Sequence, residues 1–146
     1  MASPAPVRVL IVAHRTAATP LLLNAVRARA TRSACMFTLL VPRTYWDPDT
    51  DETSATLELA IPLLDEAAGG HVEGLIGDSD PFIAVRDAVT RLSIDEIIVS
   101  TLPARVSHWL RRDLPRRLQQ FGLPVTVVTA QQSERVISGA GPSAAG

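Results

Sequence analysis

Apolar residues in this chain form short runs that alternate with longer segments of helical periodicity. The runs are rich in β-branched residues and lack regular polar interruptions, which predicts strands buried on both faces of a parallel sheet. They cover Val7–Ala13, Met36–Val41, His71–Ile76, Glu96–Ser100 and Val125–Thr129. The helical segments between them run from Thr19-Pro20 to Arg32, Thr53 to Ala68, Asp80-Pro81 to Leu92 and Asp113 to Phe121. This alternation predicts an α/β fold, a three-layer domain with a five-stranded parallel sheet and helices on both faces.

Capping signals set the predicted helix boundaries. Thr19 and Asp80 each precede a proline, as expected of an N-cap followed by proline at the first helical position. Pro62 lies inside the second helix and is expected to bend it or to break its ladder of backbone hydrogen bonds. The periodicity of the first helix predicts an apolar face of Leu22, Ala25, Val26 and Ala30, with Arg27, Arg29 and Arg32 directed outward.

Composition divides the chain into one domain with two short flanking segments. Residues 1–6 are expected to be a flexible N-terminus, residues 7–130 the domain, and residues 131–146 a flexible tail rich in Ser, Gly and Ala. The first apolar run is too short for a signal peptide or a membrane span, so a cytoplasmic location is expected.

Charge and residue usage narrow the function classes. All 14 basic residues are arginine, which argues against Walker-type phosphate loops, Schiff-base enzymes and protein kinases, because each of these needs a lysine. The net charge of −1 gives no general attraction to nucleic acid or membranes. Cys35 is the only cysteine, so no internal disulfide forms. The acidic stretch Asp47–Glu52 is interpreted as a solvated loop, because Glu52 occupies the position where a calcium loop needs glycine.

Three stretches carry a resemblance to a known family. They are Val9–Ala13, Gly77–Pro81, and Glu96–Ser100 taken with Leu123–Val128. They are similar to the opening strand, the turn into the third helix and the last two strands of the universal stress protein family. The resemblance spans almost the whole predicted domain. It implies strand order 3-2-1-4-5, a ligand crevice where the order reverses, and a homodimer formed through the edge strand Val125–Thr129.

The sequence departs from that family at its phosphate-binding loop. Nucleotide-binding members carry Gly-x2-Gly-x9-Gly-Ser/Thr after the fourth strand, whereas this chain has Ser100, Pro103, Asp113 and Leu114 at those four positions. The acid that members commonly show after the first strand is matched here by His14. The resemblance is therefore to a divergent member that lacks the glycine-rich ATP loop.

Candidate ligand-binding residues lie at the carboxyl ends of the predicted strands. Hydroxyl groups and arginines there can bind an anion in place of backbone amides. The set is His14, Arg15, Thr16, Val41, Ser100, Thr101, Arg105, His108 and Arg112. The alternative interpretation is a polar, helix-capping loop at His14–Thr16, ordinary strand-end capping at Ser100–Thr101, and a solvated turn with Trp109 and Leu110 directed inward. We predict no catalytic residue and no metal site.

The resemblance leads to one functional hypothesis and two alternatives. The first is a non-enzymatic universal stress protein-like module for regulation or the stress response, with weak or no ATP binding. The second is a nucleotide-binding protein in which Arg105 and Arg112 replace the lost amides, with adenosine near His14 and Val41. The third is a small hydrolase of this fold. An adenine nucleotide is the expected ligand if one binds.

Overall fold

A computed structural model describes residues 5–14, 16–43, 51–102, 109 and 113–129. The predicted order of elements is confirmed. The strands are β1 (Val7–Val12), β2 (Cys35–Pro42), β3 (Glu73–Gly77), β4 (Glu96–Thr101) and β5 (Val125–Thr129). The helices are α1 (Pro20–Arg32), α2 (Asp51–Ala68), α3 (Pro81–Leu92) and α5 (Leu114–Leu118), the last continued by a 3-10 turn at Gln119–Phe121.

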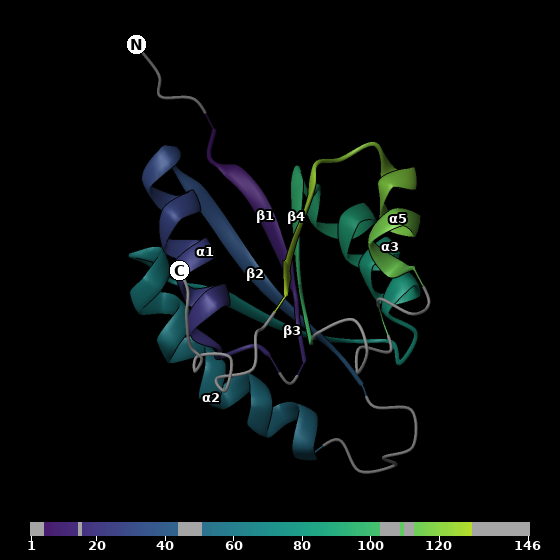
Figure 1. The fold of residues 1–146 in the computed structure, drawn as a ribbon, viewed down its shortest axis with the longest axis horizontal. Coiled ribbons are helices and arrows are strands. Elements are labelled where there is room, and N and C mark those ends of the chain that lie inside the picture. Colours follow the sequence, from purple (N-terminus) through teal and green to yellow (C-terminus); the bar gives the residue numbers. More distant parts are fainter. Residues whose placement is uncertain (1–4, 15, 44–50, 103–108, 110–112, 130–146) are drawn as a thin grey trace, which may run out of the picture.

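All five strands pair in parallel in the order β3-β2-β1-β4-β5, as the resemblance implies. Helices α1 and α2 cover one face of the sheet, and α3 and α5 cover the other (Figure 1). After β1, the chain adds β2 and then β3 on one side of β1. It then crosses back and adds β4 and β5 on the other side. The connections that follow β1 and β4 therefore run to opposite faces of the sheet. A fold of this type forms its ligand crevice between them, at the carboxyl ends of the two strands.

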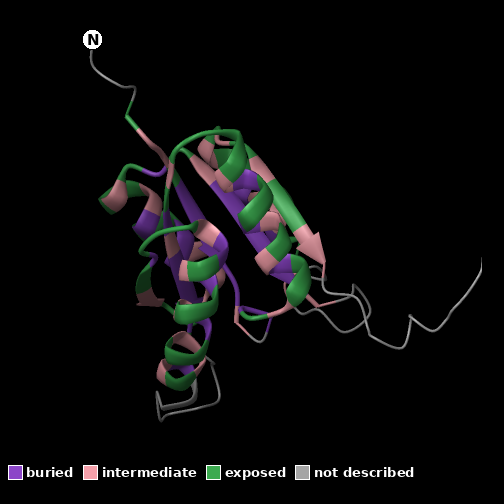
Figure 2. Ribbon diagram, turned by 90° about the vertical axis from the view of Figure 1, so that its left-hand side faces the viewer, coloured by how far each residue is buried: buried purple, intermediate pink, exposed green. Residues whose placement is uncertain are grey.

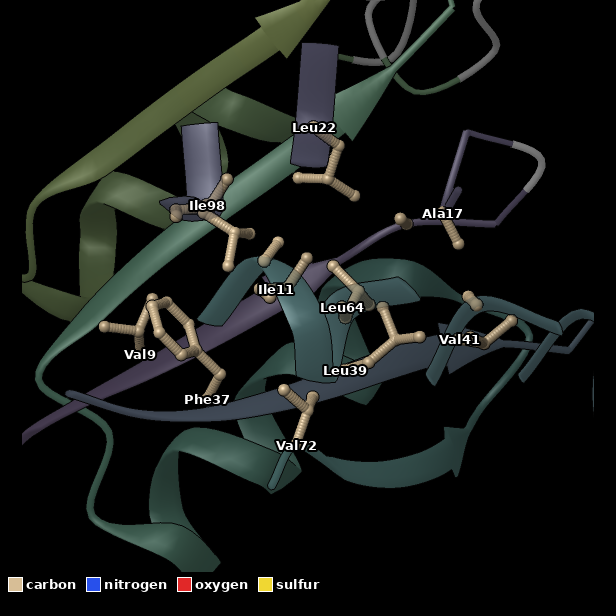
Figure 3. Packing of buried hydrophobic residues seen from close by; sticks show 14 residues of the cluster. Val9, Ile11, Ala17, Leu22, Phe37, Leu39, Val41, Leu64, Val72 and Ile98 are labelled. Atoms are coloured by element: carbon tan, nitrogen blue, oxygen red, sulfur yellow. The ribbon is translucent and has the colours of Figure 1, made fainter. Parts of the chain in front are cut away.

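Successive residues of β1 enter opposite cores, which explains why the run is apolar at every position from Val9 to Ala13. Val9 and Ile11 pack with α1 and α2 (Figure 3), whereas Leu10 and Val12 pack with α3 and α5. All four side chains are fully buried. The inner strands are almost entirely buried, while the outward sides of the helices are exposed (Figure 2).

Helix α2 continues through Pro62 as one helix from Asp51 to Ala68. A proline removes one backbone donor and leaves the carbonyl four residues earlier without its helical partner. Here both Pro62 and Glu58 are exposed, so water can satisfy that carbonyl.

The prediction that Arg29 points outward is wrong. Arg29 is only 9% exposed and lies between α1 and β4. Its Nε and Nη2 donate to both carboxylate oxygens of Glu96 at 3.0–3.2 Å, and its Nη1 donates to Ser33 Oγ at 2.9 Å. The hydrogen bonds to Glu96 raise the pKa of Arg29 above its ordinary value. The ion pair fixes α1 on the sheet.

Of the predicted N-cap residues, Asp80 caps its helix through its side chain and Thr19 does not. Asp80 caps α3 as expected, since its Oδ1 accepts from the backbone N–H of Phe82 at 2.9 Å. Thr19 occupies the N-cap position of α1, but its hydroxyl donates to the carbonyl of Thr16 instead. Asp113 precedes α5 without a side-chain cap, and the regular helix ends at Leu118, before the predicted end at Phe121.

Candidate functional site

The connection after β1 turns sharply at the carboxyl edge of the sheet. The N–H of Ala13 donates to the carbonyl of Leu40, which keeps the chain on the sheet past the end of β1. The N–H of Ala17 then donates to the carbonyl of His14. The N–H of Thr19 likewise donates to the carbonyl of Thr16, which leads into α1. These hydrogen bonds hold Thr16 over the edge beside β4.

A buried pair of hydroxyl groups joins this turn to the end of β4. Thr16 Oγ1 and Ser100 Oγ are 2.7 Å apart, and either oxygen can be the donor. Thr16 is 3% exposed and Ser100 1%. The two residues are 84 positions apart in sequence, so the hydrogen bond fixes the relative position of β1 and β4 at the switch point.

Thr101 supplies a third buried hydroxyl at the end of the same strand as Ser100. It is the last residue of β4 and is 2% exposed, and its Oγ1 has no hydrogen-bond partner among the described residues. A buried hydroxyl without a partner costs about 1–3 kcal/mol. A polar group that reached Thr101 Oγ1 would offset this cost. Because strand side chains alternate, Thr101 faces the α3 and α5 side, opposite to Ser100.

A shallow hollow lies on the α1 and α2 side of the same edge. Its volume is about 150 Å³. The lining is largely apolar and consists of His14, Ala17, Ala18, Thr56, Leu59 and Ala60. His14 therefore connects the hollow to the polar turn after β1. The site combines neutral hydroxyl groups with an apolar surface formed by α2.

The structure brings together some of the predicted residues. His14, Thr16, Ser100 and Thr101 lie at the carboxyl ends of adjacent strands β1 and β4. Val41 is fully buried in the core with α1 and α2. The other predicted residues, Arg15, Arg105, His108 and Arg112, lie outside the described residues.

The sequence interpretation missed the contribution of α2. Thr56 and Leu59 line the hollow, although neither was among the predicted site residues, and Leu59 lies outside the sheet-facing side of α2 formed by Ala60, Leu64 and Ala67. The available signal was Leu59 itself, a leucine outside that face. Trp109, which the alternative interpretation directed inward, packs against the core formed with α3 and α5.

Two other classes of site are not found within the described ranges. In those parts of the chain, no three His, Cys, Asp or Glu side chains are placed to hold a metal ion. Nor does any helix in them have the length and hydropathy needed to cross a membrane.

Comparison with known proteins finds similarity at the level of structure. No family model matches the sequence, and no curated protein matches it. The chain is similar to a universal stress protein from Archaeoglobus fulgidus, with a TM-score of 0.60 and 13% identity over 84% of this chain and 93% of that one. It is also similar to a universal stress protein in complex with cAMP, with a TM-score of 0.61 and 15% identity over 88% and 100% of the two chains.

A third similar structure is a universal stress protein family protein from Arabidopsis thaliana with AMP bound. Its TM-score is 0.55 and its identity 16%, over 88% of this chain and 95% of that one. Together these structures show that the chain has the universal stress protein fold.

Proposed function

We propose that the protein is a non-enzymatic regulatory module that binds an adenine nucleotide weakly at the carboxyl edge of β1 and β4. The observation that carries this proposal is the buried Thr101 hydroxyl, which has no partner among the described residues and follows Ser100 of the Thr16–Ser100 pair in β4. This edge is the switch point where open α/β sheets bind ligands. The proteins of this fold that hold cAMP and AMP support adenine nucleotides as the ligand class.

The residues at this edge fit the base and an oxygen of the nucleotide better than they fit a phosphate bound by backbone amides. The hydroxyl of Thr101 can donate to or accept from a ribose or phosphate oxygen, and the apolar hollow beside His14 can accept the face of a base. Pro103 stands where nucleotide-binding relatives have a glycine and has no amide hydrogen for a phosphate. We therefore expect weaker binding than a glycine-rich loop supports.

Thermal unfolding with AMP, cAMP and ATP tests nucleotide binding. A ligand at ten times its dissociation constant stabilises a protein by about 1.4 kcal/mol. For a chain of this size we expect the midpoint to rise by several degrees. No shift with any of the three at millimolar concentration would refute the proposal. Phosphate release from ATP should not exceed the rate without protein, and release above it would refute the non-enzymatic part.

The Thr101→Val variant separates a ligand contact from a structural role. Valine fills nearly the same volume and removes a buried hydroxyl that has no partner among the described residues, so the variant should be at least as stable as the wild type. The nucleotide-induced shift should fall by more than half. Thr38→Val in β2, away from the carboxyl edge, is the matched control and should keep the full shift. An undiminished shift in Thr101→Val would exclude Thr101 as a contact.

We also propose that the protein forms a homodimer through β5. This strand is at the edge of the sheet, and Val127 on it is 41% exposed. An apolar edge strand presents unpaired backbone groups that a second copy can pair with about a two-fold axis. Val127→Asp should convert the dimer to a monomer in light scattering, whereas Met36→Asp, at another exposed apolar residue, should leave it dimeric. A monomeric wild type would contradict this proposal.

A further inference from the structure

Two exposed leucines lie on the flank of α2 that faces α1. Leu59 is 73% exposed and Leu63 41%. The side of α2 that packs on the sheet is formed by Ala60, Leu64 and Ala67. Successive residues of an α-helix are rotated by about 100° around its axis. Leu57 therefore lies on one flank of the sheet-facing side of α2, where its side chain covers Gly74 of the edge strand β3. Leu59 and Leu63 lie to the other side, toward α1.

These leucines form one apolar groove with the start of α1. Leu59 and Ala18 line the same hollow, and Ala18 is itself exposed. Leu63 continues the surface one helical turn along α2. We call the surface of Ala18, Leu59 and Leu63 the α1–α2 groove. Leu21, which is 39% exposed, lies on the flank of α1 that faces β5 and extends the apolar surface toward that strand.

We propose that Val136 and Ile137 of the C-terminal segment dock in the α1–α2 groove of the same chain. They are the only large apolar residues between positions 130 and 146, where the other residues are Ala, Gly, Pro or polar. An apolar pair in an otherwise polar and small-residue segment is the expected complement of a groove lined by alanine and leucine.

The geometry of the sheet puts the groove within reach of this segment. All strands are parallel, so β5 ends at Thr129 on the same edge where β1 leads into His14 and the hollow. Strands β5 and β1 are two positions apart, which corresponds to about 10 Å at the usual spacing between strands. The chain from Thr129 to Val136 can span up to about 24 Å. Leu21 lies along the way.

Covalent attachment favours the segment of the same chain over other occupants. A short flexible linker gives a tethered segment an effective concentration in the millimolar range. A second copy at micromolar concentration competes poorly with that, and so does an unattached protein. Because Ala18 and Leu59 also line the hollow proposed for the base of a nucleotide, the segment and the base exclude each other there, and the segment docks in the nucleotide-free protein.

Disulfide trapping in the full chain tests the docking. In a Cys35→Ser background, we expect Leu59→Cys combined with Ile137→Cys to form an intramolecular disulfide at least tenfold faster than Glu58→Cys combined with Ile137→Cys. Glu58 is also exposed but is directed away from α1, so the control pair has the same linker without the groove. Equal rates would overturn the proposal, and so would a rate that rises with protein concentration, which indicates a second copy.

Methyl NMR provides a second test without cysteines. Replacing both Val136 and Ile137 with serine should shift the methyl resonances of Leu59 and Leu63. Leu75, which packs with α3 on the opposite face of the sheet, should keep its resonances. Unchanged resonances for Leu59 and Leu63 would overturn the docking. Neither test uses a nucleotide, so its outcome is independent of the proposed ligand.

Discussion

Replacing Glu96 with alanine is expected to lower the free energy of unfolding by about 3–5 kcal/mol. The variant leaves the Arg29 guanidinium buried at 9% exposure, with only its hydrogen bond to Ser33 remaining among the partners described above. Arginine cannot relieve this cost by losing its proton at any ordinary pH. In the wild type the pKa of Arg29 is raised, so its contribution is complete at neutral pH and is lost only as the pH rises through that raised value.

Urea unfolding followed by circular dichroism measures this effect, and the chain offers a matched control. Asp87 pairs with Arg86 at 3.5 Å, but both side chains are 54% exposed. Asp87→Ala should therefore change the free energy of unfolding by less than about 1 kcal/mol. The double variant Arg29→Met/Glu96→Leu should recover most of the loss, because it removes both buried charges. A loss in Glu96→Ala no larger than in Asp87→Ala would contradict the structural role of the pair.

The same ion pair shows where prediction from the sequence stops. Arg29 follows Val26 by three positions and Leu22 by seven, so its place in the helical repeat is inward. Because arginine is charged, the Arg29 side chain was nevertheless predicted to point outward. The partner, Glu96, is 67 positions away in sequence, and only the packing of α1 over β4 brings the two together. The strands were predictable because their burial depends on local apolar runs, whereas their order in the sheet was implied by the family resemblance.

The candidate site was predictable to a similar extent. The ends of β1 and β4 placed His14, Thr16, Ser100 and Thr101 at one edge, because carboxyl ends of parallel strands meet there. The hydrogen bond between Thr16 and Ser100 depends on the turn after β1, which no local pattern specifies. The hollow depends on how the start of α1 lies against α2, and so Leu59 was missed.

Replacing Gly77 with alanine is expected to lower the free energy of unfolding by about 1–3 kcal/mol. Gly77 is the last residue of β3, and a Cβ there would lie 2.8 Å from both Ala84 Cβ and Leu40 Cδ1. Ala84 Cβ is fixed to the backbone of α3 and cannot rotate away, so helix and strand must separate. Gly77 has no positive φ, which means that its role is to allow close packing rather than an unusual turn.

Gly70→Ala is the matched control for this substitution. A Cβ at Gly70 meets no atom within 4 Å, and its φ is not positive, so the expected change is within about 0.5 kcal/mol. If crowding is the cause, Leu40→Ala should relieve part of it. The double variant Gly77→Ala/Leu40→Ala would then lose at least 0.5 kcal/mol less than the sum of the single variants. Strict additivity would contradict crowding against Leu40, because the cost of Gly77→Ala would then not depend on the Leu40 side chain.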